Sequence, residues 1–351
     1  MKNALYSSCC FATILLVVAG CSIRLSSNQV HDGGIFASSN YGESWQHKVF
    51  VSQQKKQTIT ISNTDIGRII LSPHQQKELT ITTIANGIYT TTDGGEHWKP
   101  TVLNAGYYPA FAYDPGNEAI RYATTGRNIL KSANSGSTWQ VIYTDTRGEQ
   151  INAIGVDRYD TSRILAGTNG GTVLKSVNYG NDWSVKYTAG DPIRDIFFRS
   201  DDTRIVYLLT TKKGLVRSSD GGETWSSLEA ALQPFPGAAT ISQVAFTTAA
   251  PKTFYIATNY GLLKSDDGGD TWSAIQTLIP ATTVPIHTVG IDPKDPRILY
   301  FTVNNLLHKS EDGGKTWRTN YAIGTTRLIN TLLVHPTESG LLYLGTFKVK
   351  R

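Results

Sequence analysis

Cysteine is nearly absent from this 351-residue sequence, and its three copies, Cys9, Cys10 and Cys21, all lie near the N-terminus. The chain after Cys21 therefore has neither a free thiol nor a disulfide, and it lacks the cysteine pairs of structural zinc sites. We expect its stability to come from the packing of apolar side chains alone.

The sequence also has no large excess of positive or negative charge and no common catalytic motif. The formal net charge is +5, and lysine and arginine form no long run. Nucleic-acid-binding proteins carry a concentrated basic patch, so we do not expect a nucleic acid partner. No His-Glu-x-x-His, Gly-x-Ser-x-Gly or phosphate-binding loop occurs. We therefore predict no metal ion, no cofactor and no catalytic residue.

Apolar runs are short, and one of them follows a basic start, Met1-Lys2-Asn3, at Phe11 to Val18. It is too short for a membrane span of roughly 20 residues. A basic start, an apolar run and the small residues Ala19 and Gly20 are typical of an export signal. The sequence predicts a signal peptide over residues 1–20.

Tryptophan occurs seven times, and each copy ends an octapeptide of the form Ser/Thr-x-Asp/Asn-x-Gly-x-x-Trp. The third and eighth positions are Asn40 and Trp45, Asp93 and Trp98, Asn134 and Trp139, Asn178 and Trp183, Asp220 and Trp225, Asp267 and Trp272, and Asp312 and Trp317. Successive tryptophans are 53, 41, 44, 42, 47 and 45 residues apart. This spacing indicates a repeat architecture.

The octapeptide has the chemistry of a tight turn between two strands. We expect the Asp or Asn side chain to accept a hydrogen bond from the backbone amide two residues on. The hydroxyl of the Ser or Thr at the first position should form a hydrogen bond on the other side of the same turn. The glycine tolerates a positive φ. The tryptophan adds an apolar surface of ~150–250 Å², which on full burial contributes roughly 4–6 kcal/mol. A structural role is favoured over sugar stacking or cation binding.

Each repeat contains strand-like runs such as residues 241–246, 253–258 and 261–264 before the turn, and a fourth strand begins at the tryptophan. Four strands per repeat of this length indicate a propeller blade. The chain opens with a third and a fourth strand, and it ends with a first and a second. We predict an all-β, seven-bladed β-propeller of four-stranded antiparallel blades over residues 31–351, with one blade made from both termini.

The octapeptide resembles the Asp-box, or BNR, repeat of sialidases, sortilin-type receptors and photosystem II assembly factors. Val18-Ala19-Gly20-Cys21 resembles a bacterial lipobox, which implies a lipid on Cys21, a tether over residues 21–30 and attachment in the cell envelope. By this resemblance the protein is attached to the periplasmic face of the outer membrane in a Gram-negative cell, and otherwise to the outer face of the plasma membrane. The alternative is a secreted protein with a chance cysteine.

By resemblance to propellers, the first strand of each blade lines the central channel. One position of these strands forms a column of seven residues: Gly67, Pro109, Asn152, Arg194, Ser242, His287 and Asn330. With two neighbouring loop arginines, the predicted partner-binding residues are Arg68, Asn152, Arg194, His287, Arg327 and Asn330. Tyr107 and Phe235 add aromatics in entry loops, as in protein-binding surfaces. Solvated channel lining is the alternative for the column.

Two functions remain open. The first is a lipid-anchored, non-catalytic propeller that binds a protein, peptide or glycan, as the assembly factors and receptors imply. The alternative is a glycoside hydrolase of sialidase or xyloglucanase type, for which Asp191 and Asp195 are the candidate carboxylate pair. The sialidase Phe/Tyr-Arg-Ile-Pro motif is missing, since Arg24 is the only arginine before the first repeat. A basic residue precedes five turns, for instance Lys175, and we expect it to be solvated.

Overall fold

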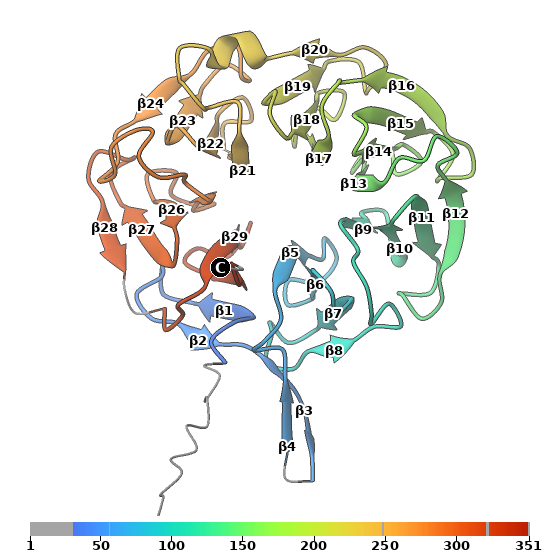
Figure 1. Cartoon of the computed structure of the whole chain (residues 1–351), viewed down its shortest axis with the longest axis horizontal. Coiled ribbons are helices and arrows are strands. Elements are labelled where there is room, and N and C mark those ends of the chain that lie inside the picture. The colour runs from blue at the N-terminus through green and yellow to red at the C-terminus, as the bar shows by residue number, and fades with distance from the viewer. Residues whose placement is uncertain (1–30, 56, 248, 321–322, 350–351) are drawn as a thin grey trace, which may run out of the picture. The chain divides into compact units, whose positions relative to one another are not determined.

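The computed structural model describes residues 31–55, 57–247, 249–320 and 323–349. The predicted signal peptide, Cys21 and the tether lie outside the described residues. Residues 32–351 form one compact unit. Within this unit, seven four-stranded antiparallel sheets stand around a common centre (Figure 1). The predicted all-β, seven-bladed architecture is confirmed.

Six blades are continuous in sequence, with their strands paired in chain order from the centre outwards. They comprise β5 (Ile66–Leu71), β6 (Leu79–Thr83), β7 (Ile88–Thr91) and β8 (Lys99–Pro100); β9 (Phe111–Asp114), β10 (Asn117–Thr125), β11 (Asn128–Ser132) and β12 (Gln140–Thr144); β13 (Ile151–Val156), β14 (Ile164–Thr168), β15 (Thr172–Ser176) and β16 (Ser184–Thr188); β17 (Ile193–Phe198), β18 (Val206–Thr210), β19 (Leu215–Ser218) and β20 (Ser226–Ser227); β21 (Ile241–Phe246), β22 (Phe254–Thr258), β23 (Leu262–Ser265) and β24 (Ser273–Ile275); and β25 (Thr288–Ile291), β26 (Leu299–Val303), β27 (Leu306–Ser310) and β28 (Arg318–Asn320).

The seventh blade, here the closing blade, combines both ends of the chain. Its order is β2 (Gln46–His47), β1 (Ile35–Ser38), β30 (Leu342–Phe347) and β29 (Leu328–Val334). Strands β1 and β30 pair antiparallel from Ile35 opposite Gly345 to Ser38 opposite Leu342. Because this pairing joins the two chain ends within one sheet, it leaves no open sheet edge at the seam of the ring.

The core lies between neighbouring blades. Every residue of β6, β14, β18, β22 and β26 is buried, because each second strand is covered on both faces by adjoining sheets. In one such layer Leu165 of β14 packs with Ile196 and Val206 of the next blade. A single blade cannot bury its faces alone, so this packing explains why the repeats form a closed ring.

All seven octapeptides make the same turn. In one copy the Ser218 hydroxyl donates to Asp220 Oδ1 at 2.8 Å and accepts from the Gly222 amide at 2.8 Å. The prediction of a bond two residues on from the carboxylate is wrong: Oδ1 accepts from the amide of Thr224, four residues on, at 2.9 Å. The longer reach lets one oxygen span the whole turn. The glycine is in the left-handed region as predicted, with φ near 90° at Gly222.

The tryptophans differ in burial. Trp98 and Trp317 are buried, whereas the other five are partly buried, so full burial does not hold for every copy. The Trp98 indole donates to the carbonyl of Lys48, which belongs to the segment leading from the preceding blade. The Trp225 indole donates within its own turn, to the carbonyl of Gly222 at 3.2 Å. The repeat therefore specifies the turn more strictly than it specifies the depth of the indole.

The basic residues before the turns are not simply solvated. Lys175 is only 6% exposed, and its ammonium donates to the carbonyl of Gly221 and to Glu223 in the next blade. Lys131 reaches the carbonyl of Tyr179 in the same way, at 2.9 Å. These side chains connect adjacent blades, because the aliphatic stem spans the gap and the charged end meets the next turn.

One hairpin, which the sequence pattern did not predict, leaves the ring. Strands β3 (Phe50–Gln54) and β4 (Gln57–Thr60) pair only with each other and project outwards (Figure 1). This insertion accounts for the longest spacing between tryptophans, from Trp45 to Trp98. The described chain also has a short 3₁₀ helix, η1 (Glu229–Leu232), and contains no helix able to span a membrane.

Candidate ligand-binding site in the central channel

The first strands of the blades enclose a cavity of about 600 Å³ at the centre of the ring. Six of the seven column residues line it: Gly67, Pro109, Asn152, Arg194, Ser242 and Asn330. His287 is not among the lining residues, and burial holds the pKa of its imidazole below the usual value. The structure thus brings together four of the predicted binding residues, Arg68, Asn152, Arg194 and Asn330, in one cavity.

A β-bulge places most of the column. The pairing between first and second strands slips by one residue between Ile66 and Arg68, and the same slip occurs around Asn152, Arg194, Ser242 and Asn330. The extra residue of a bulge leaves the ladder, and bulges often redirect a side chain at a binding site. Pro109 and His287 instead precede their strands, β9 and β25.

Arg68 crosses the channel. From β5 its guanidinium donates to the carbonyl of Pro109 at 2.8 Å, to the carbonyl of Arg194 at 2.5 Å and to Asp195 Oδ2 at 2.6 Å. Asp195 lies on β17, three blades further along the chain. Because these contacts tie β5 to β17 and to the segment that enters β9, Arg68 is a brace across the channel, and its donors already have partners.

Arg194 lines the same cavity, but its positive charge has fewer partners than that of Arg68. Its guanidinium donates to the carbonyl of Ile241 at 2.6 Å. No carboxylate of the described residues forms an ion pair with it. Burial and the nearby positive charge of Arg68 lower its pKa below the usual value. Arg194 is therefore a desolvated cation with donors facing a cavity, which favours an anionic ligand.

The amide side chains of the channel hold the inner strands together. Asn330 Nδ2 donates to the carbonyl of Ile66 at 2.7 Å, which joins the closing blade to blade β5–β8. Gln243 Nε2 donates to the carbonyls of Leu332 at 2.8 Å and Val289 at 3.2 Å. Gln243 and Thr82 also line the cavity, and the column analysis missed both because they lie outside the column.

Arg327 lies elsewhere. It is 9% exposed, and its guanidinium contacts Asp32 Oδ1 at 3.4 Å and Asp65 Oδ1 at 3.2 Å. Asp32 also accepts from the amide of Thr326 at 2.6 Å. These contacts link the segment before β1 to the loop before β29. The structure therefore places Arg327 in the seam of the ring and not in the channel.

The two loop aromatics separate. Tyr107 lines the channel cavity and is 51% exposed. Phe235 packs edge-on against Tyr260, with ring centroids 5.3 Å apart, and belongs to the periphery of a core cluster. Tyr107 is thus available to a ligand, whereas Phe235 anchors its own loop.

The candidate acid pair does not form in the channel. Asp195 is the only carboxylate among the residues that line the cavity, and Arg68 already binds it. Asp191 instead accepts hydrogen bonds from the amides of Lys212 and Lys213, at 2.5 and 3.1 Å. Glycoside hydrolysis normally requires two free carboxylates. Among the described residues there is also no cluster of His, Cys, Asp and Glu suited to a metal ion.

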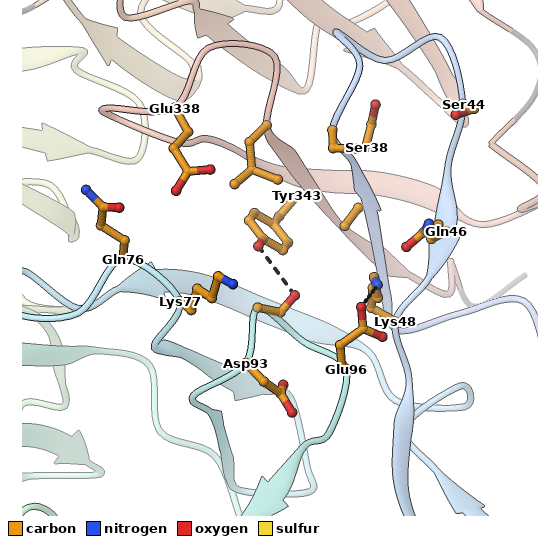
Figure 2. A pocket seen from close by; sticks show the side chains of 14 residues that line it. Ser38, Ser44, Gln46, Lys48, Gln76, Lys77, Asp93, Glu96, Glu338 and Tyr343 are labelled. Carbon is orange, nitrogen blue, oxygen red and sulfur yellow. Dashed lines mark hydrogen bonds and ion pairs between the residues drawn. The ribbon is translucent and has the colours of Figure 1, made fainter.

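A second cavity, of about 260 Å³, lies between the closing blade and blade β5–β8 (Figure 2). Lys48 and Glu96 form an ion pair within it, and the Tyr343 hydroxyl donates to the carbonyl of Gly94 at 3.4 Å. Both basic and acidic side chains line this second cavity, and the charges of Lys48 and Glu96 neutralise each other. The channel, with an uncompensated arginine, is the stronger candidate site.

The comparisons with known proteins agree with the propeller fold. The family model of the photosynthesis system II assembly factor YCF48 matches residues 176–332. A solved structure of YCF48 bound to a D1 peptide matches 82% of this chain and 94% of its own, with a TM-score of 0.62 and 14% identity. The chain is a seven-bladed BNR-repeat propeller whose fold is similar to that of YCF48. YCF48 from Cyanidioschyzon merolae matches 81% of this chain and 95% of its own, with a TM-score of 0.61 and 15% identity.

GH74 enzymes share the fold. The GH74 xyloglucanase from Xanthomonas campestris matches 81% of this chain with a TM-score of 0.64 and 18% identity. The match covers only 51% of that enzyme, so this chain spans about half the length of the GH74 proteins that it resembles. No curated protein matches the sequence. At these identities the likeness concerns the fold.

Proposed function

We propose that this protein is a non-catalytic propeller of the cell envelope that binds a peptide or a protein segment at its central channel. The observation that carries the proposal is Arg194, a desolvated arginine that faces a 600 Å³ cavity without a carboxylate partner among the described residues. A carboxylate of the bound peptide would supply the missing charge, through charge-assisted hydrogen bonds. The exposed ring of Tyr107 offers an adjacent apolar contact.

The likeness to YCF48 supports a peptide as the ligand, because YCF48 has been solved with a D1 peptide bound. The channel chemistry supports a non-catalytic role, since its one carboxylate, Asp195, is held by Arg68. The lipobox-like sequence before Cys21 supports attachment to a membrane. Each methylene of an acyl chain that is buried in the bilayer contributes ~0.8 kcal/mol, so several acyl chains on Cys21 would anchor the protein stably. In this proposal Cys21 carries the lipid and residues 21–30 connect it to the ring.

The binding experiment uses an array of synthetic peptides with either free or amidated C-termini and with or without acidic side chains. We expect wild-type protein to retain carboxylate-bearing peptides. Arg194→Gln should weaken this binding by about tenfold or more, since a hydrogen bond to a charged group contributes roughly 1.5–3 kcal/mol.

Arg204→Gln is the matched control. Arg204 is 71% exposed at its side chain and pairs only with its neighbour Asp202. Its replacement should leave peptide retention unchanged. The proposal is wrong if no peptide is retained, or if Arg194→Gln and wild-type protein bind alike.

Anchoring is tested separately by cell fractionation. The wild-type protein should appear in the membrane fraction, and Cys21→Ser should move it to the soluble fraction, because the acyl chains can no longer be attached. A Cys21→Ser protein that stays with the membrane would refute the lipid anchor and leave the channel proposal unaffected.

A further inference from the structure

Blade β5–β8 departs from the other six blades at two neighbouring positions in the channel. At the column position it has Gly67, where each of the other blades has a side chain. Its second strand contains Thr82 just before a threonine that recurs in all seven blades. The residues at the place of Thr82 elsewhere are Ala123, Gly167, Leu209, Ala257, Phe301 and Gly345. One blade therefore exchanges an apolar residue for a hydroxyl and removes the side chain opposite it.

The threonine at position 82 leaves one buried oxygen atom with no partner among the described residues. Thr82 is 1% exposed, and its Oγ1 forms no hydrogen bond with any described residue. A Cβ on Gly67 would lie 3.0 Å from that oxygen, so a glycine at this position leaves the buried hydroxyl uncrowded on the side of Gly67. Both residues line the channel.

A second unpartnered oxygen belongs to Asn330. Its Nδ2 donates to the carbonyl of Ile66, and this contact sets the orientation of the amide, because a carbonyl accepts only from the nitrogen. Asn330 Oδ1 is buried and has no partner in the described chain. Thr82 and Asn330 thus flank the same peptide, Ile66–Gly67. The Thr82 hydroxyl lies beside Gly67, and the Asn330 amide binds the Ile66 carbonyl through its nitrogen. We call this place the Gly67 slot.

We propose that the Gly67 slot binds a primary amide of the ligand. An amide oxygen and a hydroxyl together accept two hydrogen bonds, which suits a nitrogen with two hydrogens; a backbone amide has only one. The charged residues lining the channel are Arg68, Arg194 and Asp195, an excess of one positive charge, which disfavours an ammonium group. A neutral amide, such as that of an Asn or Gln side chain, satisfies both oxygens without adding charge.

This inference rests on the proposed function, since the amide belongs to the ligand whose carboxylate meets Arg194. The two subsites are tested separately by NMR titration of the full chain in a mild detergent, with the backbone amides of Gly67 and Arg194 as reporters. The probes are acetamide, N,N-dimethylacetamide, methylammonium and acetate. Dimethylacetamide is the matched control, because it keeps the carbonyl of acetamide and lacks its N–H donors.

We expect acetamide to shift the Gly67 signal in a saturable way and dimethylacetamide to leave it unchanged. Thr82→Val and Gly67→Ala should each weaken the acetamide response by about tenfold or more, as for the loss of a buried hydrogen bond. Ser242→Ala, at the same column position on β21, should not. Thr82→Val removes an unpartnered hydroxyl, so the melting temperature should be unchanged or higher.

The outcomes distinguish the slot from the arginine subsite. Arg194→Gln should abolish the response to acetate and keep the response to acetamide. If acetamide binds and acetate does not, the proposed function is wrong, whereas the amide-binding role of the Gly67 slot stands. The slot itself is refuted by equal responses to acetamide and dimethylacetamide, by no response to acetamide, by tighter binding of methylammonium, or by a Thr82→Val protein that binds acetamide as wild type does.

Discussion

The turns between third and fourth strands and the column at the channel obey opposite rules. The turn repeats the same hydrogen bonds in every blade, as in Ser38, Asn40 and Gly42 or in Ser310, Asp312 and Gly314. The column has six residue types in seven blades, and most of its members leave the strand ladder at a bulge. Positions that repeat serve folding in each blade. Positions that differ are free to serve a ligand, because one ligand meets all blades at once.

The largest expected effect tests the folding side of this contrast. Trp98→Ala should lower the free energy of unfolding by about 3–5 kcal/mol, since it removes a fully buried aromatic side chain. Trp225→Ala should cost less, because its indole is partly buried and bonds only within its own turn. Urea denaturation measures both. Equal losses would show that the depth of the indole does not decide its contribution.

The seam of the ring comes next. Arg327→Ala leaves the carboxylates of Asp32 and Asp65 without their cation, and breaking a buried ion pair costs roughly 3–5 kcal/mol. The exposed pair of Arg297 with Asp295 is the control, and Arg297→Ala should leave the melting temperature nearly unchanged, because solvent screens this pair. Thermal melting with a peptide-binding assay would check this. Arg327→Ala protein that is stable yet fails to bind peptide would return Arg327 to the binding site.

The channel brace should have a smaller effect. Arg68→Ala removes hydrogen bonds to Asp195 and to two backbone carbonyls, and we expect a loss of about 1–3 kcal/mol. A double-mutant cycle with Asp195→Ala measures the part that comes from the ion pair. Additive effects of the two replacements would show that Arg68 and Asp195 do not stabilise each other across the channel.

The smallest effect distinguishes turns with aspartate from turns with asparagine. Burial opposes ionisation of Asp93, but hydrogen bonds from Thr91 and His97 lower its pKa to about 2. Because this pKa is below the unfolded value of about 3.9, Asp93 stabilises the fold above pH 4 and loses that contribution as the pH falls towards 2. Asp93→Asn should make the melting temperature less dependent on pH in this window. An unchanged dependence would mean that Asp93 titrates alike in both states.

The sequence was informative wherever a position repeats. The tryptophan spacing predicted the number of blades, and the unpaired strands at the two chain ends predicted the closing blade. It was less informative about residues that act between blades. In sequence Lys175 looks like a solvated charge and Arg327 like a partner-binding residue, yet their partners lie in the next blade and at the other chain end. Hairpin β3–β4 was missed because an insertion follows no repeat.

For the candidate site, aligning the first strands was enough to collect six channel residues in one column. The alignment contains no information on how the side chains pair across the channel. That Arg68 is occupied by Asp195 while Arg194 is left without a carboxylate depends on the width of the closed ring, which brings β5 and β17 within reach of one side chain. The repeated octapeptide determined the fold through local hydrogen bonds, whereas the free groups of the channel were decided by contacts between strands more than a hundred residues apart.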